Sequence, residues 1–219
     1  MNTERVREQV AEVARKMAEL GLVSGTSGNV SARLPDGLMA ITSMGRGYMD
    51  MKADDIVVVD GDLDPVEGDL TPSSESLLHA AIYGARADVG GIVHTHAVYS
   101  SAVAAAGMAI PPIVDEMVVT LGGEVQVSEY APPASEEVAG RVCEALGNRD
   151  AALIRNHGAV AVGADPEAAL KASVLTERIA QIFVLSSAIG RPTALPEEVV
   201  ASEAAIFEMR RAARREKMR

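Results

Sequence analysis

Two of the four histidines in this chain, His94 and His96, stand two residues apart at the end of an apolar run. Side chains spaced in this way on a β-strand point to the same face, with Cα atoms roughly 6.5 Å apart, so both imidazoles can reach one metal ion. His157 follows a second apolar run and precedes Gly158, where a turn can expose its side chain. Three histidine ligands and one vacant position are typical of a catalytic metal site. From spacing alone, ordinary polar residues at two strand ends remain the alternative.

Two hydroxyls and a carboxylate follow Pro72 as Ser73, Ser74 and Glu75. Proline is favoured at the first position of a helix, so we expect these residues in the first turn of a helix that runs to about residue 86. A helix N-terminus attracts anions, and hydroxyls beside its free N–H groups can hold a phosphate. A simple helix cap explains the same residues. The glycine-rich loop at residues 25–29 is open to both interpretations, a phosphate loop or a plain turn.

Hydrophobic periodicity and turn residues predict the elements that position these side chains. We expect helices at residues 3–20, 72–86, 100–106, 135–146, 166–189 and from about 196 onward. We expect strands at residues 30–34, 38–42, 56–59, 89–96, 125–130, 151–156 and 160–162. Residues 113–121 are apolar but ambiguous. Hairpin-type turns join several strands, which predicts a mixed or mainly antiparallel sheet rather than a doubly wound parallel one.

Composition restricts the function further. The formal net charge is −11 and the isoelectric point is near 4.8, so the chain would repel a nucleic-acid backbone. The sequence has no G-x-G-x-x-G and no P-loop motif, which leaves nucleotide binding with little support. Cys143 is the only cysteine, so an intrachain disulfide is excluded and a reducing cytoplasm fits. No uncharged stretch reaches transmembrane length, so we expect no membrane partner.

We expect residues 1–219 to form one domain that ends in a basic helical tail at about residues 205–219. The last ten residues hold five Arg and one Lys against one Glu. Because this segment continues a helical pattern, a charged helix end or a subunit contact explains it better than an RNA- or membrane-binding arm.

Four segments taken together resemble the class II aldolase and adducin family, most closely its L-fuculose-1-phosphate aldolase branch. In sequence order they are residues 21–31, 72–75, 93–97 and 156–158. Each motif is weak alone, but the ordered set, with gaps similar to those of the family, is specific. The resemblance implies an α/β fold, a three-layer αβα sandwich around a mixed, mainly antiparallel sheet. It also implies a homotetramer with active sites at the subunit interfaces.

The resemblance assigns roles to the residues that match its motifs. His94, His96 and His157 would bind one divalent metal ion per chain, most commonly Zn²⁺, with Mn²⁺ or Co²⁺ as alternatives. Glu75 would be the catalytic acid or base, and a fourth metal ligand when substrate is absent. A separate set would hold the substrate phosphate: Gly28, Asn29, Met44, Gly45, Ser73 and Ser74.

These roles imply a metal-dependent aldolase that acts on a small sugar phosphate. It would reversibly cleave a ketose 1-phosphate, such as L-fuculose 1-phosphate or a 5-deoxypentulose 1-phosphate, into dihydroxyacetone phosphate and an aldehyde. The metal would act as a Lewis acid. Glu75 would protonate the enediolate carbon, or remove that proton in the synthetic direction, and no lysine Schiff base is needed.

Two tyrosines of the family's aldolases have no counterpart in this chain. Glu116 aligns with the first, and no tyrosine follows Tyr130 to match the second, which lies in the C-terminal tail of a neighbouring subunit. We therefore expect Glu116 to be the second catalytic proton donor, with a solvent-facing or salt-bridged glutamate as the alternative. We also expect the Arg-rich tail to shape the aldehyde pocket of a neighbouring subunit.

Other members of the family have different functions. The sugar-phosphate 4-epimerases tend to carry Asp in place of Glu75, and the methylthioribulose-1-phosphate dehydratases lack the Ser-Ser-Glu pattern but have a Glu near the position of Glu116. Glu75 therefore favours aldol cleavage, with dehydration as the second choice. A non-catalytic, adducin-like scaffold would be expected to lose the histidine set, which this chain retains. The motifs contact only the phosphorylated end of a substrate, so they do not identify the aldehyde.

Overall fold

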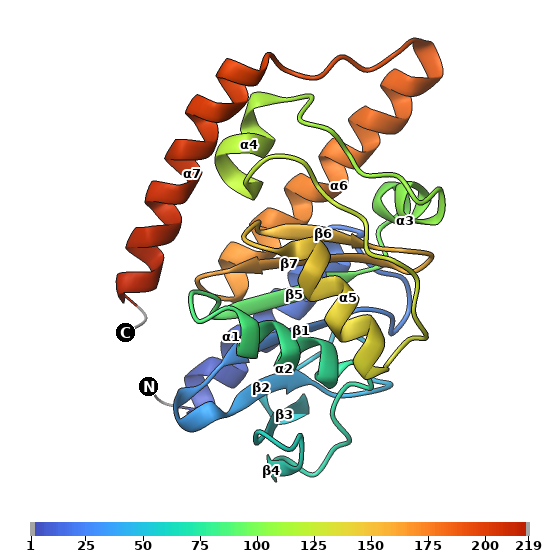
Figure 1. Cartoon of the computed structure of the whole chain (residues 1–219). Helices are drawn as coiled ribbons and strands as arrows, with labels where there is room; N and C mark the ends of the chain where they lie inside the picture. Colours follow the sequence, from blue (N-terminus) through green and yellow to red (C-terminus); the bar gives the residue numbers. More distant parts are fainter. Residues whose placement is uncertain (1–2, 218–219) are drawn as a thin grey trace.

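A seven-stranded sheet forms the middle of the protein in a computed structural model that describes residues 3–217 (Figure 1). The strands are β1 (Asn29–Arg33), β2 (Met39–Thr42), β3 (Ile56–Val59), β4 (Pro65–Glu67), β5 (Gly91–Thr95), β6 (Ala151–Ile154) and β7 (Gly158–Gly163). Their spatial order is β4-β3-β2-β1-β5-β7-β6. Every pairing between these strands is antiparallel, so the predicted mainly antiparallel sheet is confirmed.

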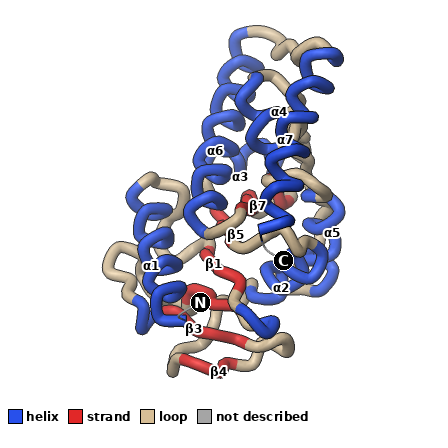
Figure 2. Tube along the Cα trace, turned by 90° about the vertical axis from the view of Figure 1, so that its left-hand side faces the viewer, coloured by secondary structure: helices blue, strands red, loops and turns tan. Residues whose placement is uncertain are grey.

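Helices cover both faces of this sheet and complete the three-layer αβα sandwich. They are α1 (Thr3–Glu19), α2 (Ser76–Ala85), α3 (Val98–Ala105), α4 (Asp115–Leu121), α5 (Glu136–Leu146), α6 (Pro166–Ile189) and α7 (Glu197–Lys217). Figure 2 shows α1 on one side of the strands and α2 with α5 on the other. Helix α6 lies on the α1 side, against β5 and β7, and contacts α3 and α4, and α7 packs against α4. The predicted fold class is therefore confirmed.

Side chains of β7 alternate between the two helical layers, as a strand covered on both faces requires. Val160 and Val162 pack in the core beneath α2 and α5, whereas Ala159 and Ala161 pack beneath α6. The small alanine side chains let α6 approach the sheet closely. By length and composition α6 could cross a membrane, but here it packs on the sheet as a core helix.

The segment before α2 differs from the prediction, because the helix begins at Ser76 rather than at Pro72. Pro72 forms a β-bridge with Ser43, and the backbone N–H of Ser73 donates to the carbonyl of Thr42 at 3.1 Å. These contacts place residues 72–74 in an extended segment beside the end of β2, instead of in the first turn of the helix. Ser73, Ser74 and Glu75 therefore precede the helix.

The strand expected at residues 125–130 is not a regular strand in the structure. The predicted strand at 125–130 forms only isolated bridges, among them the parallel contact between Val127 and Leu153. It exchanges only two backbone hydrogen bonds with Leu153, too few for a regular strand. The ambiguous segment at 113–121 contains α4, and the short exposed strand β4 was not predicted, because its three residues carry no apolar alternation.

Candidate metal centre and active site

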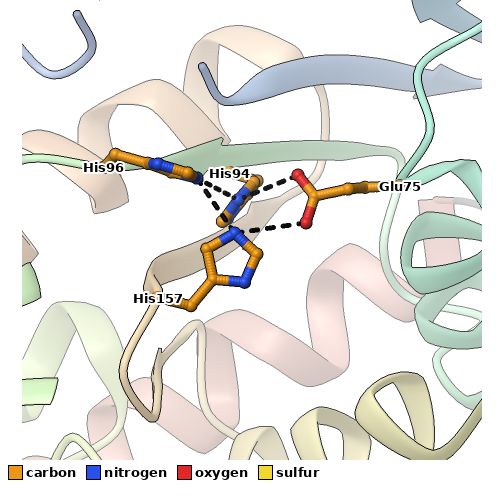
Figure 3. Close-up of side chains that lie close together, drawn as sticks. All are labelled: Glu75, His94, His96 and His157. Carbon is orange, nitrogen blue, oxygen red and sulfur yellow. Dashed lines mark hydrogen bonds and ion pairs between the residues drawn. The ribbon is translucent and has the colours of Figure 1, made fainter. Parts of the chain in front are cut away.

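Four side chains from distant segments converge at one end of the central strands (Figure 3). His94 lies in β5, His96 one residue beyond it, His157 in the turn between β6 and β7, and Glu75 immediately before α2. One ligand atom from each lies within 4.8 Å of the others. The structure thus brings together the four residues that the sequence assigned to metal binding and acid–base chemistry.

The ring nitrogens of this cluster face one another. The Nε2 atom of His96 lies 3.0 Å from Nε2 of His94 and 3.0 Å from Nε2 of His157. Nδ1 of His94 lies 2.9 Å from the carbonyl oxygen of Ala159, which can only accept, so Nδ1 donates this hydrogen bond and Nε2 faces the cluster. Oxygens of Glu75 lie 3.1 Å from Nε2 of His94 and 3.3 Å from Nε2 of His157. Converging lone pairs and one carboxylate form a donor set that fits a divalent cation.

The electrostatics favour the metal-binding protonation states of His96, His157 and Glu75. Burial, together with repulsion from His94 and His157, lowers the pKa of His96 to about 4. Burial and His94 likewise lower the pKa of His157. Burial raises the pKa of Glu75, but His94, His157 and a hydrogen bond from Asn29 outweigh it, so this pKa lies well below its ordinary value. Near neutral pH, His96 and His157 are therefore uncharged and Glu75 is ionised. These are the protonation states that bind metal ions.

Local backbone conformation explains the residue types around His157. Asn156 adopts a left-handed conformation with φ 58°, which asparagine tolerates better than most residues. A Cβ atom at Gly158 would lie 2.2 Å from the carbonyl oxygen of Thr95, so only glycine allows β7 to approach β5 here. The turn can therefore place His157 beside His96.

A polar cavity of about 370 Å³ opens beside Glu75, His96 and His157. All six residues predicted to hold a phosphate line it: Gly28, Asn29, Met44, Gly45, Ser73 and Ser74. Asn29 stands opposite His94 in the β1–β5 ladder, and its Nδ2 donates to Oε2 of Glu75 at 2.9 Å. The hydroxyl of Ser43, which also lines the cavity, is buried without a hydrogen-bond partner among the described residues. The Ser43 hydroxyl is thus a buried, unpaired polar group at the edge of the cavity beside the metal-binding cluster.

Tyr48 was missed by the sequence analysis, although it also lines this cavity. Its hydroxyl donates to the carbonyl oxygen of Gly28 and lies 3.4 Å from that of Thr26, so it anchors the glycine-rich loop. Burial and the nearby charge of Glu75 raise its pKa. The only feature of the sequence that pointed to Tyr48 was its position next to Gly45 and Gly47, and hydrophobic periodicity does not identify such a position.

Glu116 lies outside this cavity within the described chain. It occupies the first turn of α4, its side chain is 54% exposed, and Oε2 lies 3.6 Å from Nη1 of Arg178 on α6. It lines a separate cavity together with Lys16 and Leu20 of the α1 region. One chain alone therefore does not bring Glu116 to the substrate, and its assignment stays a prediction.

The basic tail forms most of α7, and residues 218–219 of the predicted tail lie outside the described residues. Arg214 binds Asp88 at 2.7 Å and Asp150 at 2.8 Å, at the start of β5 and β6. This is the end of the strands opposite to the histidine cluster. Within its own chain the tail thus anchors α7 to the sheet rather than lining the cavity.

The fold and this site define a metal-binding α/β enzyme of the aldolase class. A family model, the class II aldolase and adducin N-terminal domain, matches residues 8–184. The chain belongs to this family, and it is a class II aldolase, a lyase.

Three relatives illustrate the similarity over nearly the whole chain. The chain is 32% identical to a 5-deoxy-D-ribulose 1-phosphate aldolase of Bacillus thuringiensis, covering 95% of this chain and 98% of the relative. It is 35% identical to an L-fuculose phosphate aldolase of Escherichia coli, with 92% and 93% covered. A solved structure of an L-fuculose 1-phosphate aldolase superposes with a TM-score of 0.88 at 33% identity, covering 93% and 96%.

Proposed function

We propose that this enzyme reversibly cleaves a ketose 1-phosphate into dihydroxyacetone phosphate and an aldehyde. The observation that carries the proposal is the cluster of Glu75, His94, His96 and His157 beside a polar cavity lined by serines and glycines. Relatives named for L-fuculose phosphate and for 5-deoxyribulose 1-phosphate support this substrate class, because both substrates share the phosphorylated end.

His94, His96 and His157 would hold one divalent ion, and we propose Zn²⁺, which takes imidazole and carboxylate ligands in tetrahedral sites. When bound, the ion supplies a Lewis acid for the substrate carbonyl. Glu75 would complete the donor set in the absence of substrate. The proton on Nδ1 of His94, held by Ala159, keeps the His94 ring in the orientation that this role requires.

Glu75 would move the proton at the carbon next to the carbonyl. Its carboxylate is held by Asn29 on one side and faces the histidines on the other, so both oxygens have fixed directions. In cleavage it donates a proton to the enediolate carbon of dihydroxyacetone phosphate, and in synthesis it removes that proton. A carboxylate fixed in this way loses little orientational freedom during the reaction.

The phosphate would occupy the part of the cavity nearest Ser73 and Ser74. The backbone N–H of Glu75 already donates to Oγ of Ser73 at 3.3 Å, which leaves the Ser73 hydroxyl proton for a ligand. Positive φ angles at Gly28 and Gly45 allow both loops to approach a phosphate through the backbone.

We further propose a cytoplasmic homotetramer with active sites at the subunit interfaces. Glu116 and Arg178 are exposed on α4 and α6, outside the cavity of their own chain. Glu116 would therefore act as the second proton donor only in the active site of a neighbouring subunit. The Arg-rich tail would likewise shape the aldehyde pocket of a neighbouring subunit and not that of its own chain.

A retro-aldol screen tests the proposed function. Zn²⁺-loaded protein is incubated with the 1-phosphates of L-fuculose, L-rhamnulose, 5-deoxyribulose and methylthioribulose, and dihydroxyacetone phosphate is measured by a coupled assay. We expect release from at least one sugar and none from metal-stripped protein. Loss of water without release of dihydroxyacetone phosphate would instead establish a dehydratase, and inversion at C4 an epimerase.

A further inference from the structure

The three histidines of the metal centre are held in different ways. His94 pairs on both sides of β5, with Asn29 of β1 and Val160 of β7, and its ring is held by a backbone carbonyl. His96 lies beyond the last residue of β5, and His157 lies in a turn. No sheet ladder among the described strands therefore fixes these two residues.

Helix α3 contacts the chain at both of these histidines. It begins at Val98, two residues after His96, so its first turn sets the direction in which the chain leaves His96. Oγ of Ser101 lies 3.5 Å from the carbonyl oxygen of His157. The backbone N–H of Asn156 donates to the carbonyl of Ala104 at 3.3 Å. The position of α3 therefore governs the position of two of the three ligands.

The N-terminus of α3 is held by a residue of another helix. Its N-cap residue, Ala97, has no side-chain acceptor for the free N–H groups of the first turn. The carboxylate of Glu177 on α6 takes this place: it accepts from the N–H of Tyr99 at 2.8 Å, and from the N–H and Oγ of Ser100 at 2.8 and 2.7 Å. A carboxylate at a helix N-terminus is also favoured by the helix dipole.

We infer that Glu177 is a positioning residue for the metal centre, which it fixes by binding α3 to α6 and thereby placing His96 and His157. The inference rests on the proposed metal site, although not on the identity of the substrate. It assigns to Glu177 an effect on metal affinity that a helix cap remote from the site would not have.

Titration of the metal-free protein with Co²⁺ tests this inference, because the visible absorption of bound Co²⁺ reports both affinity and coordination geometry. We expect Glu177→Ala to weaken Co²⁺ binding about 10-fold, the lower end of the range for residues that support metal ligands, and to change the spectrum. Glu177→Gln keeps one acceptor oxygen, so its affinity should lie between those of the wild type and Glu177→Ala.

Asp165→Ala is the matched control. Asp165 is also a carboxylate that caps a helix, accepting from the N–H of Ala168 at 2.8 Å, but it caps α6 at the far end of the sheet. It should lower thermal stability and leave the Co²⁺ affinity and spectrum unchanged. Equal loss of affinity in Asp165→Ala and Glu177→Ala, or wild-type affinity in folded Glu177→Ala, would overturn the inference.

A milder variant covers the case in which Glu177→Ala does not fold. Ser100→Ala removes one of the three hydrogen bonds, and we expect a smaller loss of Co²⁺ affinity in the same direction. Wild-type affinity in both Ser100→Ala and Glu177→Gln would overturn the inference. Wild-type protein that binds Co²⁺ but cleaves no sugar phosphate would overturn the proposed function alone, whereas a failure to bind Co²⁺ would overturn both.

Discussion

The two ends of the central strands each bury a polar cluster, and the clusters differ in how their charges are matched. At one end, three imidazoles and Glu75 present converging lone pairs. At the other end, Arg86 and Arg214 bind Asp88 and Asp150 at distances of 2.7–3.4 Å. The second cluster is neutralised by its own ion pairs, whereas the first presents a donor set that fits a divalent cation.

The pKa shifts follow this division at Asp88 but not at Asp150, whose pKa is raised by burial despite its ion pairs with Arg214 and Arg86. Burial raises the pKa of Asp88, but hydrogen bonds from Arg86 and Arg214 outweigh it, so the pKa lies well below its ordinary value. In the histidine cluster, burial and mutual repulsion lower the pKa of His96 and His157. Matched charges thus indicate a structural role, and unmatched donors indicate ligand binding.

Removal of one histidine should have the largest effect. His94→Ala deletes a ligand from the unmatched cluster, so we expect metal content to fall from about one ion per chain to background, with loss of aldol cleavage. Elemental analysis and the cleavage assay measure both. Full metal content in His94→Ala and also in His157→Ala would contradict the ligand assignment.

Glu75→Gln should leave the metal largely bound and slow the chemistry. Loss of a general acid or base lowers kcat by roughly 10²–10⁴-fold. Steady-state kinetics on the sugar phosphate that the screen identifies would measure this change, with metal content as the control. Near-full turnover would show that another residue moves the proton.

Glu116→Gln tests the proposed second proton donor. We expect about a 10²-fold slower cleavage, at the lower end for proton transfer, but unchanged deuterium exchange into dihydroxyacetone phosphate. Deuterium exchange needs only Glu75 and the metal. Comparing the exchange rate with the cleavage rate therefore distinguishes the role of Glu116 from that of Glu75. Stability should hardly change, since the exposed pair with Arg178 contributes about 0–1 kcal/mol. Equal loss of both rates would assign Glu116 a structural or metal-binding role.

Arg214→Ala disrupts the matched cluster instead. We expect unfolding to require about 2–3 kcal/mol less free energy, below the ~3–5 kcal/mol of a fully broken buried pair, because Arg86 still binds Asp88. Chemical denaturation measures this loss, and metal content should stay unchanged. A loss of metal equal to that in His94→Ala would show that the two clusters are not independent.

The same variant should change how stability depends on pH. Because the folded pKa of Asp88 is lowered, its stabilising contribution is present above the unfolded value of about 3.9 and is lost as the pH falls below it. Without Arg214 the folded pKa moves back toward that value, so stability should fall less steeply on acidification. Denaturation curves between pH 6 and pH 3 would measure the slopes; equal slopes in both proteins would contradict this assignment.

Ser74→Ala should have the smallest effect. A hydroxyl that binds phosphate contributes similarly in the ground and transition states, so we expect KM to rise about 10-fold with little change in kcat. Kinetics with the phosphorylated sugar would measure this. A fall in kcat at constant KM would place Ser74 at the reacting atoms instead.

Most elements and the metal-binding set were predictable from local pattern. The helix at 166–189 and the strand at 56–59 match the structure, because Asp165–Pro166 marks a helix start and four β-branched residues mark a strand. The start of α2 was wrong, because pairing of residues 72–73 with the end of β2 overrides the helix signal of Pro72. A prediction from a short stretch of sequence cannot include this pairing, because the partners are distant in the chain.

The sequence by itself determined which residues are candidates for the chemistry, because the imidazole spacing, the Ser-Ser-Glu segment and the Asn-His-Gly turn occur in the order of the family's motifs. Only the tertiary structure decided how they are supported and which charges are compensated. Glu177 is distant from His96 in sequence, and Arg214 is distant from Asp88, yet each pair is joined through packed elements. Local propensity does not encode this long-range packing. Only the tertiary structure therefore distinguishes the charge-matched Arg–Asp cluster from the Glu75–histidine cluster that presents ligand atoms.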